Sequence, residues 1–139
     1  MREGKLGMEL EPIGSIHTKF KNIQEAPFQG RWCKETSVIE IFPEHVPGLK
    51  DIEYASYLIV LYWCHLATRD TLQTKTPHGP EIRGVFACRS PHRPNPIAFC
   101  VAKLLGQEEN RLLVKGLDAL DGSPLLDIKP YFSDLDSIT

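Results

Sequence analysis

The sequence has no long hydrophobic run. No window approaches the ~18 consecutive apolar residues that a membrane-spanning helix needs. The opening stretch, MREGKLGMELEPIG, also lacks the apolar core of a secretory signal peptide. We therefore expect a cytoplasmic chain.

Cysteine and net charge are also low. The 139 residues include four cysteines, Cys33, Cys64, Cys88 and Cys100, and these form no C-x-x-C pair. Without that spacing we expect neither a disulfide framework nor a zinc ribbon, and we expect the thiols to be reduced. The net charge of −2 gives no overall positive field of the kind that attracts nucleic acid or an anionic membrane. A local basic patch is still compatible with this net charge.

The common nucleotide-binding motifs are absent. No G-x-G-x-x-G follows a predicted strand and no Walker loop occurs, which excludes the usual doubly wound nucleotide-binding folds. Helix signals are few as well. Residues 44–56, EHVPGLKDIEYAS, predict one short helix.

Strand signals dominate what is present. Residues 37–42 (SVIEIF) alternate apolar and polar side chains. Residues 57–63 (YLIVLYW) form a continuous apolar and aromatic run, typical of a strand that is buried on both faces or closes a barrel. Further strands are predicted at residues 8–18, 85–88, 97–105, 111–117 and 124–131. The polar stretch QEEN at 107–110 predicts a hairpin turn.

These segments, separated by many of the eleven prolines and ten glycines, predict a mainly β fold. We expect a compact, mostly antiparallel β-barrel of about seven strands, with short helices and long loops. The length is enough for one hydrophobic core. Residues 1–139 are therefore predicted to form a single domain.

The middle of the chain carries a stiff polar segment, CRSPHRPNPIAFCVAK at residues 88–103. Pro91, Pro94 and Pro96 each fix their own φ and hold the preceding residue in an extended conformation. A loop that is already rigid loses little conformational entropy when it binds a ligand. We call residues 88–96 the proline loop.

The side chains of the proline loop offer many hydrogen-bond donors. Arg89 and Arg93 carry forked guanidinium groups that suit a carboxylate or a phosphate. Ser90, His92 and Asn95 can read other polar groups of a small molecule. The alternative is a proline-rich surface turn whose arginines are merely solvated, and the residues alone leave both interpretations open.

Other polar residues allow two interpretations as well. His65 follows the apolar run, where a histidine is either a structural residue at a strand end or part of a site. Asp118, Asp121 and Asp127 surround an Asp-Gly turn, which explains them on its own. Carboxylates beside a pocket also hold a ribose diol or an amino group, or act as a base. Residues 27–29, PFQ, form either a turn or a pocket wall.

Two other catalytic interpretations fit poorly. A zinc site built from Cys88, His92 and residues 64–65 lacks the usual ligand spacing. A hydrolase built on Ser90 lacks the G-x-S-x-G elbow and the helix that supplies an oxyanion donor.

Five segments carry a resemblance that covers nearly the whole chain. They are IGSIHTKFKN (13–22), APFQG (26–30), LIVLYWCH (58–65), GVFACRSPHRPNPIA (84–98) and LDALDGSPLLDIKPY (117–131). In this order and spacing they resemble the TsaA-like family, whose best-understood members are the tRNA methyltransferases called TrmO. The last two motifs are long and highly specific.

The resemblance implies a β-barrel that binds S-adenosylmethionine outside the usual Rossmann-type fold, as a homodimer with the cofactor near the interface. The implied reaction is N6-methylation of N6-threonylcarbamoyladenosine at position 37 of certain tRNAs. A non-catalytic module that binds S-adenosylmethionine or a related nucleoside is the alternative. Longer members continue into a C-terminal domain, so the chain resembles a short form without it.

The resemblance also implies site residues by position. The expected cofactor-binding residues are Pro27, Phe28, Gln29, His65, Leu66, Arg89, Leu117, Asp118, Ala119 and Leu120. Asp127 and Tyr131, in the DIKPY motif, are the candidate bases, with His92 as a third. For a tRNA substrate we expect a basic patch beside the pocket, formed by Arg31, Lys34, Lys75, Arg83 and Arg93.

Overall fold

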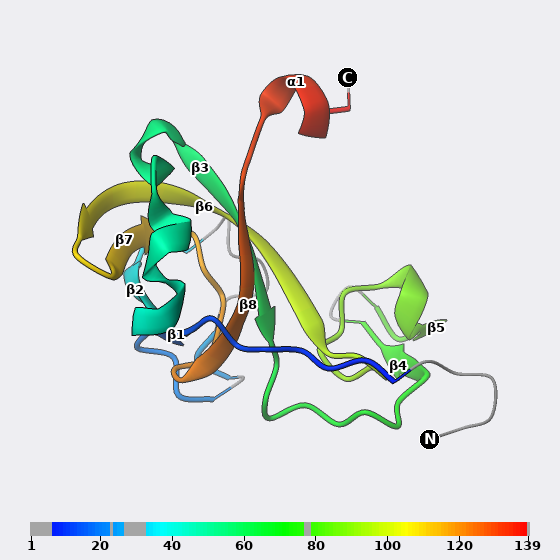
Figure 1. Ribbon diagram of the computed structural model, residues 1–139. Coiled ribbons are helices and arrows are strands. Elements are labelled where there is room, and N and C mark those ends of the chain that lie inside the picture. Colours follow the sequence, from blue (N-terminus) through cyan, green and yellow to red (C-terminus); the bar gives the residue numbers. More distant parts are fainter. Residues whose placement is uncertain (1–6, 23, 27–32, 77–78, 139) are drawn as a thin grey trace.

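The protein is described by a computed structural model that covers residues 7–22, 24–26, 33–76 and 79–138. Within these residues six antiparallel strands close into a barrel in the order β1-β2-β7-β6-β3-β8 (Figure 1). The barrel strands are β1 Gly14–His17, β2 Thr36–Ile41, β3 Tyr57–Trp63, β6 Ile97–Glu108, β7 Arg111–Lys115 and β8 Ser123–Pro130. The predicted mainly β, antiparallel barrel is therefore confirmed.

The side chains of β3 show why the apolar run forms a barrel wall. Leu58, Val60 and Tyr62 are at most 5% exposed and belong to the core, whereas Ile59 and Leu61 between them are half-buried. This alternation is that of a strand with one face in a closed core and one face outside. The same core also contains Ile16, Ile39, Ile41, Leu49, Cys100, Ala102, Leu112, Val114, Leu117, Ala119 and Leu125.

The predicted hairpin at the polar stretch 107–110 is confirmed. Strands β6 and β7 pair up to Glu108 and Arg111. Glu109 in the turn has a left-handed backbone with φ of 56°, a conformation that is common in tight turns.

Two short strands form a separate hairpin. They are β4 Gln73–Lys75 and β5 Ile82–Gly84, which pair with each other and not with the barrel. In Figure 1 this hairpin lies beside the barrel, well away from the short helix α1 (Ser133–Asp136). Neither element was predicted, because segments of three or four exposed residues carry no clear periodicity.

The predicted helix at 44–56 is instead a pair of 3-10 helices, η2 Pro43–Leu49 and η3 Ile52–Tyr54. Pro47 lies inside η2 and has no N–H group for an α-helical bond. Asp51, between the two, has a left-handed backbone with φ of 69° that interrupts any continuous helix. Among the described residues no helix is long and apolar enough to cross a membrane.

The strand predicted at 85–88 is wrong, because Val85–Ala87 form a 3-10 helix, η4. Val85 is fully buried, and its N–H donates to the carbonyl oxygen of Leu72 at 2.9 Å. The segment therefore follows a tertiary contact with a neighbouring loop and does not pair in a sheet.

Candidate functional site

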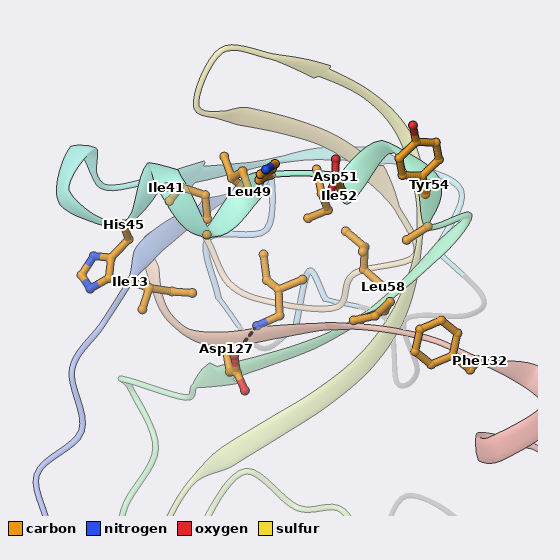
Figure 2. Close-up of a pocket in the computed structure, with 15 residues that line it drawn as sticks. Ile13, Ile41, His45, Leu49, Asp51, Ile52, Tyr54, Leu58, Asp127 and Phe132 are labelled. Carbon is orange, nitrogen blue, oxygen red and sulfur yellow. Dashed lines mark hydrogen bonds between the residues drawn. The ribbon is translucent and has the colours of Figure 1, made fainter.

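Two cavities lie at opposite ends of the barrel. The first, the cap cavity, has a volume of about 580 Å³ and lies under η2 and η3, where β3 begins and β8 ends (Figure 2). Its apolar lining includes Ile13, Ile41, Leu49, Ile52, Leu58, Ile128 and Phe132. The second, the loop cavity, has a volume of about 1390 Å³. It lies where β3 ends and β6 and β8 begin, and the proline loop forms one wall.

Arg93 holds the proline loop in its shape from within. Its Nη2 donates to the carbonyl oxygen of Val85 at 2.8 Å, and its Nη1 donates to those of Ser90 at 3.0 Å and Cys88 at 3.2 Å. A half-buried guanidinium with three carbonyl acceptors is a structural brace. The guanidinium donors that could have bound a ligand are therefore engaged by backbone carbonyl groups near and within the proline loop.

The segment after β3 holds the proline loop from outside. Arg69 donates to the carbonyl oxygen of Pro94 at 2.7 Å and to Oδ1 of Asn95 at 3.0 Å. The backbone N–H of Thr68 donates to Nδ1 of His92 at 3.1 Å. The loop is thus anchored on both sides, and the interpretation as a freely solvated surface turn does not fit.

Arg89 has a different environment from Arg93. Its guanidinium carbon lies 5.9 Å from the centroid of the Phe99 ring, within the range of a cation–π contact. Arg89 lines the loop cavity, and no acidic side chain of the described residues forms an ion pair with it. Its forked donors therefore remain available for an anionic ligand.

A carboxylate network lies in the loop cavity near the barrel core. The Tyr62 hydroxyl donates to Oδ1 of Asp118, and the Cys100 thiol lies 2.9 Å from the same oxygen. Tyr62, Asp118 and Cys64 line the cavity, whereas Cys100 belongs to the core beneath. We call Tyr62, Cys100 and Asp118 the carboxylate network.

Burial controls the protonation of the groups around Asp118. Burial, followed by the nearby Cys100 and Asp118, raises the pKa of Tyr62 far above its ordinary value. Burial and Asp118 likewise raise the pKa of Cys100. Burial and the Asp118 charge raise the pKa of Cys64 to about 11, and Arg93 opposes that shift. All three side chains therefore keep their protons near neutral pH.

The sequence did not single out Tyr62 or Cys100 as site residues, and it offered Cys64 only for a zinc site whose spacing fits poorly. The available signal was the inward register of β3, which places the Tyr62 hydroxyl toward the barrel core with Leu58 and Val60. A polar group that faces a core needs a hydrogen-bond partner. Finding that partner requires the fold, since Asp118 is 56 residues away from Tyr62.

The structure gathers half of the expected cofactor-binding residues in the loop cavity. These are His65, Leu66, Arg89, Asp118 and Leu120. Leu117 and Ala119 are buried in the core, at 0% and 1% exposure. They alternate along the chain with Asp118 and Leu120, which line the cavity. Pro27, Phe28 and Gln29 lie outside the described residues.

The two candidate bases lie elsewhere. Asp127 lines the cap cavity, where its Oδ1 accepts the N–H of Ile128 (Figure 2). Its Oδ2 lies 3.0 Å from Nζ of Lys129. Tyr131 lines neither cavity, and its backbone N–H donates to the carbonyl oxygen of Tyr57. The third candidate, His92, does line the loop cavity.

The expected basic patch comes together in part. Lys75 of β4 and Arg83 of β5 line the loop cavity, and Arg83 pairs with Glu81 at 2.8 Å. Arg93 is engaged by carbonyl groups. Lys34 does not line the cavity and Arg31 lies outside the described residues. In the part of the chain that the structure covers, no group of His, Cys, Asp or Glu is arranged to hold a metal ion.

These features define a small ligand-binding β-barrel with a rigid, arginine-bearing loop over a carboxylate. The chain belongs to the tRNA-methyltransferase O (TrmO) family, since residues 15–137 match the N-terminal domain of that family. The match to the crystal structure of TrmO from Pseudomonas aeruginosa has a TM-score of 0.81 at 32% identity, and it covers 96% of this chain and 60% of that one.

Two relatives from Archaeoglobus fulgidus are more similar in sequence. One, named a probable S-adenosyl-L-methionine-binding protein, is 56% identical over 94% of this chain, which spans 36% of that relative. The other, named an S-adenosyl-L-methionine-binding protein, is 50% identical, with 94% of both chains covered. The chain thus spans about a third of the first relative and nearly all of the second.

Proposed function

We propose that the protein is an S-adenosylmethionine-dependent methyltransferase that N6-methylates N6-threonylcarbamoyladenosine at position 37 of tRNA. The observation that carries the proposal is the loop cavity, which brings His65, Leu66, Arg89, Asp118 and Leu120 to one place under the proline loop. These residues come from three separate parts of the sequence. Family membership and the names of the two Archaeoglobus fulgidus relatives support the same cofactor.

The residues of the loop cavity fit S-adenosylmethionine chemically. The cofactor, when bound, supplies a methyl group on a positively charged sulfonium. Arg89 offers forked donors for its carboxylate, and Asp118 offers a negative charge in the same cavity. The apolar side chains of Leu66, Leu120 and Ile97 offer surface for the adenosine.

Catalysis in this cavity depends chiefly on placement. Methyl transfer needs the acceptor nitrogen in line with the donor, so a rigid binding loop contributes by orientation. The acceptor also loses one proton, and His65, His92 and Asp118 line the cavity as possible acceptors. The proposed roles of Asp127 and Tyr131 as bases stay predictions, and they require the acceptor to approach a part of the barrel outside the loop cavity.

The rim of the loop cavity supports an RNA substrate. Lys75 and Arg89 place positive charge in its lining, where Arg83 pairs with Glu81, although the net charge of the chain is −2. RNA recognition of a single base normally uses a loop whose base is unstacked. Access to position 37 should therefore require an anticodon loop whose base is unstacked and presented, and for a tRNA substrate we propose a cytoplasmic location. The four free cysteines are compatible with that location.

The outer face of β3 and β6 supports a homodimer. Cross-strand pairing places Leu61 beside Phe99 and Trp63 beside Ile97. Phe99 and Ile97 are 48% and 42% exposed, so the face is a contiguous apolar surface outside the barrel. Arg89 lies over Phe99, which puts the loop cavity at the edge of this face. A dimer formed there would have its cofactor near the interface.

A methyl-transfer assay tests the proposed function. Purified protein is incubated with labelled S-adenosylmethionine and tRNA that carries N6-threonylcarbamoyladenosine, and the same tRNA without the threonylcarbamoyl group is the control. We expect label only in the modified nucleoside of the first tRNA. Tight cofactor binding without labelled product would contradict the proposed methyltransferase activity and would favour the alternative, a non-catalytic binding module.

A further inference from the structure

The carboxylate network is asymmetric, because its two donors approach only one oxygen of Asp118. Both the Tyr62 hydroxyl and the Cys100 thiol approach the same oxygen, Oδ1 of Asp118. No donor among the described residues contacts Oδ2. Two donors on one oxygen fix the rotation of the carboxylate of Asp118, a residue that lines the loop cavity, and the lone pairs of Oδ2 stay available for a further partner.

Both donors of the carboxylate network are buried. Tyr62 is 5% exposed and Cys100 is 5% exposed, so neither can donate to water instead. Burial raises the pKa of both groups, which keeps them in the protonated, donating form. Two buried donors in their protonated form therefore hold the orientation of the Asp118 carboxylate.

We propose that Tyr62 and Cys100 are positioning residues that hold Asp118 as a fixed anion, and that Asp118 binds a positively charged group of the ligand in the loop cavity. This inference rests on the proposed function and adds the residues that set its charge selectivity. Arg89, which also lines the cavity, offers the complementary positive charge. The site is therefore matched to a ligand that carries both signs of charge.

S-adenosylmethionine has two cationic groups that suit Asp118, the sulfonium and the α-ammonium. S-adenosylhomocysteine keeps only the ammonium, and 5′-methylthioadenosine has neither. Comparing the three ligands therefore shows whether a cation is recognised and which one. If the role of Tyr62 were merely structural, Tyr62→Phe would weaken the binding of all three ligands equally.

Titration calorimetry with these three ligands tests the inference. The proteins are the wild type, Asp118→Asn, Tyr62→Phe and Tyr57→Phe, where Tyr57 is a half-exposed tyrosine at the other end of β3. We expect Asp118→Asn to weaken the binding of S-adenosylmethionine by about tenfold. Tyr62→Phe should weaken it in the same direction by a smaller factor, and Tyr57→Phe should have no effect.

The neutral ligand decides the interpretation. We expect 5′-methylthioadenosine to bind all four proteins with affinities equal within about twofold, since it gives Asp118 no charge to bind. If Asp118→Asn weakens the binding of S-adenosylmethionine alone, Asp118 binds the sulfonium. If it weakens the binding of S-adenosylhomocysteine equally, Asp118 binds the ammonium. Both results support the inference. Unchanged binding of S-adenosylmethionine to Asp118→Asn overturns it, as does an equal loss of all three ligands in Tyr62→Phe.

A measurement without ligand separates this inference from the proposed function. The infrared S–H stretching band of Cys100, identified by its loss in Cys100→Ala, should lie at low frequency because the thiol donates to a carboxylate. Asp118→Asn should shift it upward. If the wild type binds none of the three ligands, the proposed function fails. A Cys100 band that Asp118→Asn leaves unchanged shows that the network does not form.

Discussion

Arg69 donates from Nε to the carbonyl oxygen of Pro94 at 2.7 Å, across 25 residues of sequence. Its guanidinium carbon also lies 5.1 Å from the centroid of the Trp63 ring. One side chain thus joins the end of β3 to the proline loop. The proline loop is held by the barrel wall as well as by its own prolines.

Removal of this link should loosen the proline loop. We expect Arg69→Ala to lower the free energy of unfolding by about 1–2 kcal/mol, because the variant cannot form the two hydrogen bonds to the loop. Urea denaturation measures the change. Arg111→Ala is the matched control, since Arg111 is an exposed arginine on β7 that pairs with Glu40 at 3.3 Å, and such surface pairs contribute little. Equal effects of the two variants would contradict a special role for Arg69.

Arg89 should affect binding without affecting folding. We expect Arg89→Ala to weaken S-adenosylmethionine binding by about 1.5–3 kcal/mol, because the variant lacks a charge-assisted hydrogen bond to the ligand. The free energy of unfolding should stay within about 0.5 kcal/mol of the wild type. Calorimetry and denaturation measure the two quantities. A cofactor dissociation constant that matches the wild type would remove Arg89 from the site.

The rim cations should govern the salt dependence of tRNA binding. We expect the double variant Lys75→Ala and Arg83→Ala to reduce the slope of log K against log salt by about 0.7–0.9 for each phosphate group that the two side chains neutralise in the wild type. Filter binding at several salt concentrations measures the slope. Lys50→Ala is the control, because Lys50 lines the cap cavity at the opposite end of the barrel. An identical slope in the double variant and the control would place the RNA elsewhere.

Cys64 should reduce stability in alkaline solution. Its pKa rises from 9.0 in the unfolded reference to about 11 in the folded state. Above pH 9 the unfolded chain releases the thiol proton while the folded chain retains it, so unfolding becomes easier as the pH rises toward 11. Below pH 9 the thiol is protonated in both states and contributes no slope.

Denaturation of the wild type and of Cys64→Ala at a series of pH values measures this effect. We expect the stability of the wild type to fall more steeply between pH 9 and 11 than that of the variant. Other titrating groups are common to both proteins and cancel in the difference. Parallel curves would show that the folded thiol titrates normally.

Gly14 should tolerate no side chain. A Cβ at this position would lie 2.1 Å from the carbonyl oxygen of Glu40, where β1 pairs closely with β2. We expect Gly14→Ala to destabilise the barrel by about 1–3 kcal/mol, the usual cost of overpacking. Gly106→Ala is the control, because a Cβ there meets no atom within 4 Å. Thermal denaturation of the two variants measures the difference.

Much of the barrel was predictable because its signals are local. The alternation in β2 and the apolar run of β3 depend only on neighbouring residues, and both strands were placed correctly. The segment at Val85 was not, since its conformation depends on a contact with Leu72 that neighbouring residues do not reveal. The 3-10 helices over residues 43–54 were missed in type because Pro47 and Asp51 interrupt an otherwise helical pattern.

The candidate site was predictable in composition and less so in the role of each residue. The residue types of the proline loop gave Arg89 and Arg93 the same forked donors, and only the resemblance implied cofactor binding by Arg89. The structure engages Arg93 with three backbone carbonyl groups and leaves Arg89 at the cavity. The difference arises from the path of the backbone, which the residue types do not encode individually.

The sequence by itself determined the strand content, the stiffness of the proline loop and the family, because each is written in contiguous residues. Only the tertiary structure decided that Tyr62 and Cys100 face Asp118, and that Asp127 faces the other end of the barrel. Barrel closure pairs strands that are distant in sequence, such as β3 with β8 and β1 with β8. The register of those pairs selects which polar side chains meet in a cavity.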